Sequence, residues 1–310
     1  MQTQNITRVV LWMTGTLLSF SAMAVSIRLL SNKLTVFEVL LVRSFGALVI
    51  LFALLAIRPS LRPQMKTKRL PMHFFRSVTH FAGQYCWALS LTLLPFAMVF
   101  ALEFTLPAWA LVLSVFVLGE KLTKGRIIVI VMGLIGCLVI LRPGIQAFQP
   151  AALLVLACSF FYAVFNVYTK KMTATETTFS IVFWMNLLQF PLGLAGSDPL
   201  FVLRLDTWQY LPLACVGIAG LFAHYCIANA FRYGDASVVV PLDFLRVPLI
   251  AVVGWMFFGE SVDTLVFVGA GIILAGILWN LRAEAKSGTQ NISLPEDEGL
   301  PEPRNSQIGQ

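Results

Sequence analysis

Long apolar segments alternate with short polar connections along most of the chain. Ten of these segments approach the roughly 20 residues that a helix needs to cross about 30 Å of hydrocarbon. They cover residues 9–30, 35–57, 74–94, 96–118, 124–142, 151–170, 177–196, 209–231, 236–258 and 264–282. Because most connections are short, consecutive segments are expected to be antiparallel neighbours. The pattern predicts an all-α, polytopic membrane protein with ten transmembrane helices.

The second half of the chain repeats the first. A shift of 140 residues lays 223–282 over 83–142 without a gap, and four dipeptides then match in identity or in kind: Tyr85-Cys86 with Tyr225-Cys226, Glu103-Phe104 with Asp243-Phe244, Gly119-Glu120 with Gly259-Glu260, and Leu141-Arg142 with Leu281-Arg282. This self-similarity predicts two homologous halves, 1–145 and 146–283. Residues 284–310 have almost nothing apolar to bury and are predicted to be a disordered cytoplasmic tail.

The lysines and arginines are distributed unevenly between the two sides of the membrane. With the N-terminus in the cytoplasm, sixteen fall on the cytoplasmic side and four, namely Arg28, Lys33, Arg142 and Arg204, on the outer side. This excess follows the positive-inside rule and predicts that both termini are cytoplasmic. Because each half has five helices, the second half then enters the membrane upside down. The chain is therefore predicted to form two inverted repeats, with its functional site where they meet.

The composition agrees with an integral membrane protein. Hydrophobic residues make up 58% of the 310 residues and charged residues only 12%, and a soluble protein of this length could not shield so much apolar surface from water. The net charge of +7 does not indicate nucleic-acid binding, because the basic residues lie between apolar segments. The five cysteines have no CxxC spacing, so we expect neither a metal site nor a cofactor.

Several short motifs occur in a fixed order within the two halves. They are Leu118-Gly119-Glu120-Lys121-Leu122, Leu141-Arg142-Pro143-Gly144 and Phe258-Gly259-Glu260, together with Arg43, Arg76, Pro241 and Pro248. With these motifs the chain resembles the EamA family of the drug/metabolite transporter superfamily over about residues 9–282. The second half departs from the pattern, since it lacks the proline of Leu-Arg-Pro-Gly and a counterpart of Arg43. The resemblance implies a secondary transporter of the cell inner membrane, in a family that exports amino acids or takes up compounds such as S-adenosylmethionine or riboflavin.

Four ionisable residues lie deep inside the apolar segments: Arg43, Glu103, Asp243 and Arg246. A charge in lipid is costly unless it is paired or faces water, so each is a candidate for substrate binding. Asp243 and Arg246 are three residues apart on one helix and are expected to pair, which leaves Arg43 as the expected partner of Glu103. Two structural ion pairs and two pairs lining a central cavity are both compatible with this pattern.

Polar and aromatic residues extend the predicted site. His80, Gln84 and Trp87 share one face of the third segment at spacings of four and three residues. Other segments contribute further candidates at mid-span: Trp109, Tyr162, Asn166, Trp184, Asn186, Gln189 and His224. Interhelical hydrogen bonding is the alternative role for the polar ones. Pro107, Pro191, Pro241 and Pro248 permit bends in the helices that carry the site.

The predicted function is secondary transport of a small zwitterionic or neutral amphipathic metabolite by alternating access. The four deep charges sum to zero, and aromatic side chains suit a substrate with an apolar part. A channel or facilitated-diffusion pore is the first alternative, although no ring of charges marks a pore. An enzyme is the second, but the sequence has no HExxH motif. The substrate, the direction of transport, the coupling ion and the oligomeric state, including a homodimer, are left open.

Overall fold

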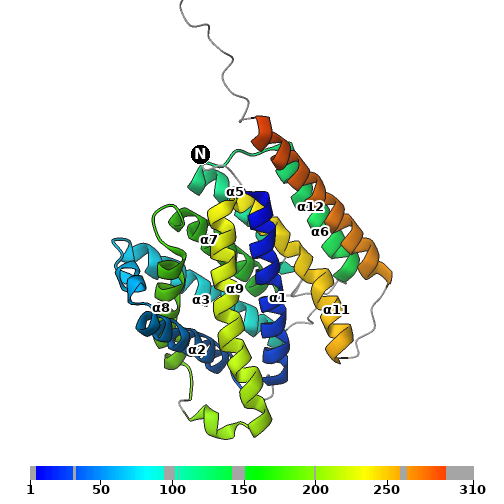
Figure 1. Ribbon diagram of the computed structural model, residues 1–310. Helices are drawn as coiled ribbons and strands as arrows, with labels where there is room; N and C mark the ends of the chain where they lie inside the picture. Colours follow the sequence, from blue (N-terminus) through cyan, green and yellow to red (C-terminus); the bar gives the residue numbers. More distant parts are fainter. Residues whose placement is uncertain are drawn as a thin grey trace, which may run out of the picture.

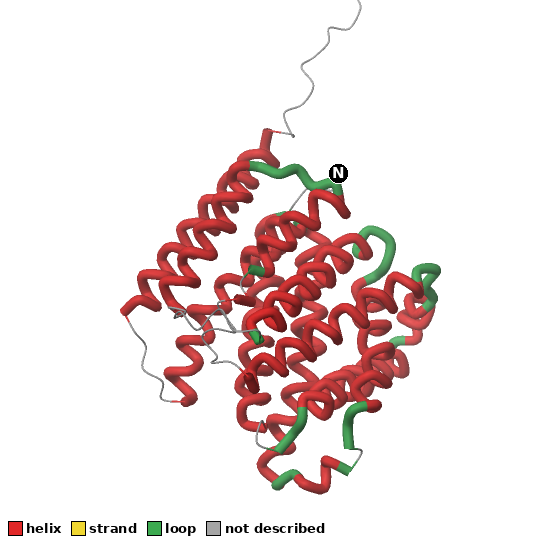
Figure 2. The backbone as a smooth tube through the Cα atoms, turned by 180° about the vertical axis from the view of Figure 1, so that it is seen from behind, coloured by secondary structure: helices red, strands yellow, loops and turns green. Residues whose placement is uncertain are grey.

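The computed structural model describes residues 5–30, 33–93, 102–103, 105–141, 151–198, 200–258 and 264–290. Within these residues the chain is a helical bundle without strands (Figures 1 and 2). The helices are α1 (Ile6–Leu30), α2 (Val36–Ile57), α3 (Leu70–Leu93), α5 (Leu106–Leu118), α6 (Lys124–Leu141), α7 (Ala152–Met172), α8 (Thr178–Ala195), α9 (Tyr210–Tyr233), α10 (Ala236–Val239), α11 (Arg246–Phe258) and α12 (Thr264–Gln290). Short 3₁₀ helices complete the chain: η1 (Pro59–Met65), η3 (Phe201–Arg204), η4 (Thr207–Gln209) and η5 (Val240–Leu245).

The described helices follow the apolar segments of the sequence closely. Five of them are long and apolar enough to cross a membrane: Ile6–Ile27, Val36–Ile57, Ala152–Met172, Thr178–Ala195 and Thr207–Tyr233. Leu106–Leu118 and Phe267–Trp279 are shorter apolar helices. The chain is thus an all-helical protein with several membrane-type helices, and the number ten stays a prediction. α12 continues to Gln290, past the predicted tail boundary at 284, and residues 291–310 of the predicted tail lie outside the described residues.

The main helix contacts join the first half of the chain to the second. α1 packs along α9, α2 along α8, α3 along α7, and α6 along α12, as Figure 1 shows for α6 and α12. A shift of 140 residues carries α1 to α7, α3 to α9, α2 to α8 and α6 to α12. Exchanging each helix for its counterpart therefore turns the α1–α9 contact into the α7–α3 contact. The α2–α8 and α6–α12 contacts are unchanged by this exchange. This reciprocity is what a pseudo-twofold relation between two repeats produces.

The predicted segment 236–258 is not one helix. It is divided into α10, the 3₁₀ segment η5 and α11. Pro241 stands at the start of η5, and Pro248 stands near the start of α11, where proline cannot donate to the carbonyl four residues before it. The tighter 3₁₀ geometry at this position marks a discontinuity in a helix that would otherwise run without interruption.

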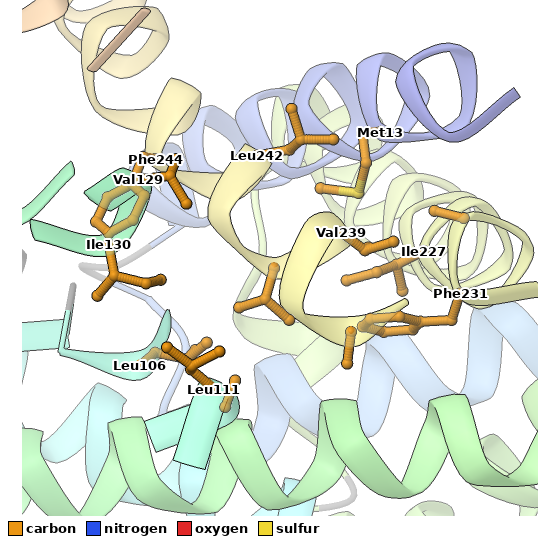
Figure 3. Packing of buried hydrophobic residues seen from close by; sticks show 14 of the residues in the cluster. Met13, Leu106, Leu111, Val129, Ile130, Ile227, Phe231, Val239, Leu242 and Phe244 are labelled. Carbon is orange, nitrogen blue, oxygen red and sulfur yellow. The ribbon is translucent and has the colours of Figure 1, made fainter. Parts of the chain in front are cut away.

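The core of the bundle holds this discontinuity in place. Val240, Leu242 and Phe244 of η5 are buried, whereas Asp243 between them is only half-buried. Figure 3 shows η5 packed against Leu106 of α5 and Ile130 of α6. Most side chains of η5 therefore enter the hydrophobic core, whereas the carboxylate of Asp243 pairs with Arg246.

Glycines bring α2 and α9 into close contact. A Cβ placed on Gly217 would lie 3.1 Å from the Cα of Gly46, so the two backbones touch. One turn further on, a Cβ on Gly220 would lie 2.6 Å from the Cγ of Arg43, so this glycine makes room for the arginine side chain. The contact between α2 and α9 therefore depends on residues without side chains.

We expect the Gly217→Val variant to be less stable than the parental protein. The isopropyl group of valine at this contact would separate α2 from α9, and overpacking of this kind costs about 1–3 kcal/mol. Thermal unfolding in detergent, followed by size-exclusion fluorescence, measures the effect. Gly271→Val is the matched control, because a Cβ at Gly271 has nothing within 4 Å. Equal melting temperatures for the two variants would show that the α2–α9 contact contributes little.

Candidate functional site

A buried guanidinium binds two carboxylates where the two halves of the chain meet. Arg246 Nη2 donates to Glu103 Oε1 at 2.8 Å and to Asp243 Oδ2 at 2.9 Å. The second carboxylate oxygen of Glu103 accepts a hydrogen bond from Trp87 Nε1 at 2.9 Å. We call these four residues the arginine–acid cluster. Its formal charge is negative, since two acids surround one base.

The backbone around the arginine–acid cluster is irregular on both sides. Arg246 is the first residue of α11 and Asp243 lies in η5. Glu103 precedes α5, which begins at Leu106 with Pro107 in its first turn. The Oγ of Ser159 in α7 lies 3.2 and 3.1 Å from the carbonyl oxygens of Leu102 and Glu103 and 2.9 Å from that of Val155, so its single O–H is shared among them and contacts the backbone that carries the Glu103 carboxylate. The cluster is therefore positioned by helix ends rather than by the middle of a regular helix.

The predicted pairing of the deep charges is right in one case and wrong in the other. Asp243 and Arg246 form the expected i,i+3 ion pair. Glu103 does not pair with Arg43, as the sequence suggested, but shares the guanidinium of Arg246. The reason is that η5 turns Arg246 toward α5, whereas Arg43 of α2 faces α8 and α9. One guanidinium shared by two carboxylates thus replaces the two separate ion pairs that the sequence predicts.

A second polar cluster surrounds Arg43. Its Nη1 lies 2.9 Å from Nε2 of His224, and its Nη2 donates to Oε1 of Gln189. The amide nitrogen of Gln189 donates to Nδ1 of His80 at 2.9 Å and to the carbonyl of Ser77 at 2.9 Å. We call Arg43, His80, Gln189 and His224 the histidine cluster. Four helices, α2, α3, α8 and α9, each supply one of its members.

Aromatic rings surround the histidine cluster and connect it to the arginine–acid cluster. Phe165 stacks on His80 with a centroid distance of 4.0 Å, and the Tyr162 ring lies 5.7 Å from the same imidazole. Phe20 of α1 meets His224 edge-on at 5.8 Å, and the guanidinium of Arg246 lies 6.0 Å from the centre of the same ring. One phenyl ring therefore contacts both polar clusters.

The remaining predicted site residues are dispersed. Gln84 is buried on α3, on the same face as His80, and Asn166 is buried on α7. Asn186 donates to the carbonyl of Val182 in its own helix. Trp109 is 41% exposed and packs edge-on against Phe160, and Trp184 donates to the carbonyl of Met65 in η1. The last two lie outside both clusters, so we leave them out of the site proposed below.

One member of the site, Phe20, did not emerge as a candidate from the sequence. Gln189 did, because it lies three residues after Asn186 in an apolar helix and polar residues inside the membrane are functional candidates. Phe20 has no such signal, because it is one of 25 phenylalanines and lies in an apolar segment. Its position became evident only from the packing of α1 against α9.

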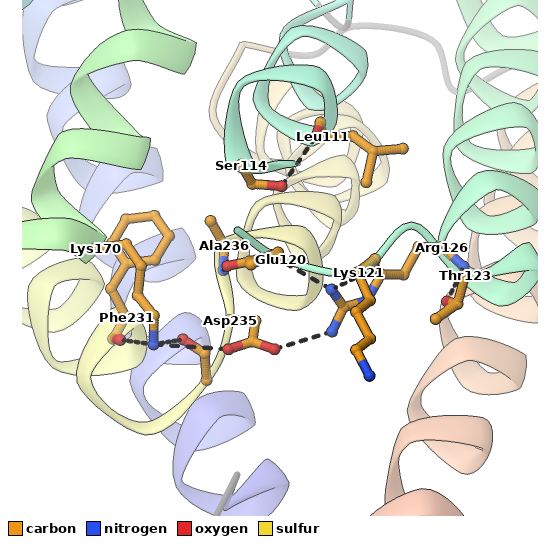
Figure 4. Close-up of polar contacts among 11 residues, drawn as sticks. Leu111, Ser114, Glu120, Lys121, Thr123, Arg126, Lys170, Phe231, Asp235 and Ala236 are labelled. Atoms are coloured by element: carbon orange, nitrogen blue, oxygen red, sulfur yellow. Dashed lines mark hydrogen bonds and ion pairs between the residues drawn. The ribbon is translucent and has the colours of Figure 1, made fainter. Parts of the chain in front are cut away.

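A network of four charged residues joins the two halves at one end of the bundle (Figure 4). Arg126 Nη2 donates to Asp235 Oδ2 at 2.9 Å, and its Nη1 lies 3.4 Å from Glu120 Oε2. Glu120 Oε1 accepts from the backbone N–H of Ala236 at 2.8 Å, at the start of α10. Lys170 donates to the carbonyls of Phe231 and Gly234 and approaches Asp235 from the other side. We call Glu120, Arg126, Lys170 and Asp235 the Asp235 network.

Other charged contacts lie where the sequence predicts the opposite membrane surface. Arg204 binds Glu38, which is buried at the start of α2, and Lys33 Nζ lies 3.8 Å from Asp206. All of these residues are predicted to be external, and all members of the Asp235 network are predicted to be cytoplasmic. Residues assigned to the same side by charge therefore lie together in space, although their orientation in a cell stays a prediction.

Metal ligands are not grouped in the part of the chain that the structure describes. No three histidine, cysteine, aspartate or glutamate side chains in that part are arranged to hold an ion. Cys86, Cys158, Cys215 and Cys226 are free thiols. The chemistry available at the two clusters is therefore ion pairing, hydrogen bonding and aromatic contact with a small molecule.

Comparisons with known proteins agree on one family. The sequence profile of the EamA-like transporter family matches residues 7–142 and again residues 149–282. An S-adenosylmethionine uptake transporter of Rickettsia prowazekii is 26% identical over 276 residues, which are 89% of this chain and 93% of the relative. A riboflavin transporter of Vibrio cholerae is 28% identical over 227 residues, or 73% and 76% of the two chains. A solved structure titled "Crystal structure of protein" has the same fold, with a TM-score of 0.75, 17% identity, and coverage of 90% of this chain and 98% of that chain.

We expect Arg246→Gln to destabilise the protein strongly. The variant would leave the carboxylates of Glu103 and Asp243 beside each other without their shared cation, and removing one partner of a buried ion pair costs about 3–5 kcal/mol. The fraction of monodisperse protein after extraction in detergent measures the loss. The triple variant Arg246→Gln, Glu103→Gln, Asp243→Asn should recover most of it, because no charge is then left unpaired. No recovery would show that Arg246 stabilises the fold by packing alone.

Proposed function

Because the chain belongs to the EamA-like transporter family, we propose that it is a secondary transporter that moves a small zwitterionic or neutral amphipathic metabolite across the inner membrane of a bacterium by alternating access. In this proposal the ten predicted segments are transmembrane helices in two inverted repeats with both termini cytoplasmic. The bundle presents its substrate site between the repeats, at the level of the arginine–acid and histidine clusters.

The observation that carries this proposal is the position of the arginine–acid cluster. Glu103 from the first half and Asp243 from the second bind one guanidinium at a discontinuous helix. Asp243 lies eight residues after Asp235, beyond α10 and part of η5, which is roughly 14 Å along the chain at about 1.5 Å per α-helical and 2.0 Å per 3₁₀ residue. Discontinuous helices near the midplane, at the interface of two repeats, are typical substrate and ion sites of secondary transporters.

The side chains of the two clusters suit a substrate with charged and apolar parts. Trp87, Tyr162 and Phe20 provide aromatic faces for stacking and for cation–π contacts. The carboxylates and guanidinium groups provide partners for an amine and a carboxylate. The names of the two kinds of relative specify S-adenosylmethionine and riboflavin, and both compounds contain a large heterocycle. S-adenosylmethionine also has an ammonium, a carboxylate and a sulfonium group.

The Asp235 network is proposed as the cytoplasmic gate. It fastens the end of α5 to the start of α10, and these are the two elements that lead directly to Glu103 and Asp243. The side chains of Arg126 and Glu120 are only 6% and 7% exposed, whereas those of Lys170 and Asp235 are 21% and 32% exposed, so the Arg126–Glu120 part of the network is shielded from water. Alternating access requires such a closed contact to open when the repeats move relative to each other.

We expect Glu103→Gln and Asp243→Asn each to reduce transport at least several-fold while the protein still folds. Each variant keeps one carboxylate on Arg246, so the guanidinium stays paired, but the charge balance at the site changes. Uptake by membrane vesicles of substrates from the family measures the effect. Asp198→Asn is the matched control, because that side chain is 53% exposed and lies at the predicted outer surface. Parental rates for both site variants would place the substrate site elsewhere.

A labelling experiment tests the gate and its sidedness together. In a background without native cysteines, Ser114→Cys is buried in α5, where the Ser114 carbonyl accepts from the Glu120 N–H. We expect an impermeant maleimide to label it from the cytoplasmic side only after Glu120→Gln and Asp235→Asn have weakened the network. Lys121→Cys should react from the cytoplasmic side and Asp206→Cys from outside. Labelling of Lys121→Cys from outside would reverse the orientation, and unchanged protection of Ser114→Cys would contradict the gate.

A further inference from the structure

Two buried arginines in the bundle have no acidic partner among the described residues. Arg43 is 2% exposed, and its contacts are His224 and Gln189. Arg76 is 1% exposed, and it donates to Thr169 Oγ1 and to the carbonyl of Ile181, with Phe165 under its guanidinium at 4.4 Å. Arginine remains charged in proteins. The region around the histidine cluster therefore carries a positive charge that no acidic side chain in the described part of the chain pairs with.

The hydrogen bonds of the histidine cluster leave donors unused. Because arginine can only donate, His224 must accept at Nε2 and carry its proton on Nδ1. That N–H has no partner in the described chain, and neither do Nε of Arg43 or the hydroxyl groups of Ser44 and Ser77. Buried polar groups are nearly always hydrogen-bonded. The unused N–H groups of Arg43 and His224, whose side chains contact each other, form a set that is complementary to an anion.

The arginine–acid cluster has the opposite character and lies next to this set. Glu103 and Asp243 exceed Arg246 by one negative charge, so the cluster attracts a cation. The Phe20 ring centre lies 5.8 Å from that of His224 and 6.0 Å from the guanidinium carbon of Arg246. The anion-attracting and cation-attracting regions therefore border the same phenyl ring. Because the ammonium and carboxylate of a lone α-amino acid group share one carbon, a substrate that spans this ring needs a second cationic group further from its carboxylate.

We infer that the histidine cluster is the subsite for the carboxylate of the transported substrate, and that Glu103 and Asp243 receive a cationic group several bonds away from it. The substrate class is an amino acid whose side chain carries a cation, such as a sulfonium or a second ammonium, and not a neutral heterocycle. This inference rests on the transport function proposed above and specifies its substrate. Between the two kinds of relative, it favours the charged compound over riboflavin.

The test compares two compounds that differ only in the carboxylate with a third, neutral compound. S-adenosylmethionine has the carboxylate and the sulfonium, its decarboxylated form lacks the carboxylate, and riboflavin lacks both charges. The first measurement is the shift in melting temperature that each compound causes in the purified full-length protein. The second is competition with labelled S-adenosylmethionine for uptake into proteoliposomes. Binding and transport are thus read separately.

We expect S-adenosylmethionine to bind about tenfold or more tightly than its decarboxylated form, as the loss of a charge-assisted hydrogen bond predicts. Arg43→Gln should abolish this difference by weakening only the binding of the carboxylate form, and Arg43→Lys should retain part of it. Arg62→Gln, in the exposed part of η1, is the matched control and should bind like the parental protein. If Arg43→Gln does not fold, the subsite is tested by comparing the binding of the three compounds to the parental protein.

Each outcome bears on one claim. Binding with the expected preference but without uptake would refute the transport function and support the subsite. Uptake with equal affinity for the two adenosyl compounds, or a larger stabilisation by riboflavin, would overturn the subsite and leave transport intact. A folded Arg43→Gln variant that still prefers the carboxylate form would also overturn it, as would the absence of any stabilisation by S-adenosylmethionine.

Discussion

A guanidinium in the interior of a membrane bundle is costly unless it has polar partners, and Arg246 is paired with carboxylates from both halves of the chain. Its position depends on η5, because a regular helix from 236 to 258 would not hold Asp243 and Arg246 at a break facing Glu103. The break in turn depends on prolines at 241 and 248 and on the buried side chains that anchor η5 in the core. Sequence, local backbone and ion pairing are therefore linked at this one point, and the interface between the repeats forms around it.

The two polar clusters differ in kind, which is significant for a transporter. The arginine–acid cluster is an ion-pair group with excess negative charge, whereas the histidine cluster contains a guanidinium held by neutral partners. Neither arrangement is favourable for stability alone, since apolar residues would fill the same volume without a desolvation cost. Two unlike clusters next to Phe20 are explained if a dipolar molecule passes between them. The charges then serve selectivity more than folding.

The helix pairing explains how such a site can be exposed to each side in turn. Every main contact joins one half to the other, so a small rotation of one half alters all of them together. The Asp235 network and the Arg204–Glu38 contact lie at opposite predicted ends of the bundle, and each joins the two halves. Closely packed glycines such as Gly46 and Gly217 let helices slide without large side chains moving out of the way. The site and the contacts at its two ends therefore belong to one mechanical unit.

The sequence by itself shows the apolar segments, the internal repeat, the deep charges and the Asp243–Arg246 pair. Hydrophobicity, charge and i,i+3 spacing are local properties, so they can be recognised without knowing which helices pack together. The partner of Glu103 was not, since it depends on which helix faces α5 once η5 has turned Arg246 toward it. Arg43 found His224 and Gln189 because α2 packs between α8 and α9, a contact between residues more than 140 positions apart in the chain. Phe20 had no distinguishing pattern at all. Long-range packing selects one partner among many chemically equivalent ones, and only the tertiary structure contains that selection.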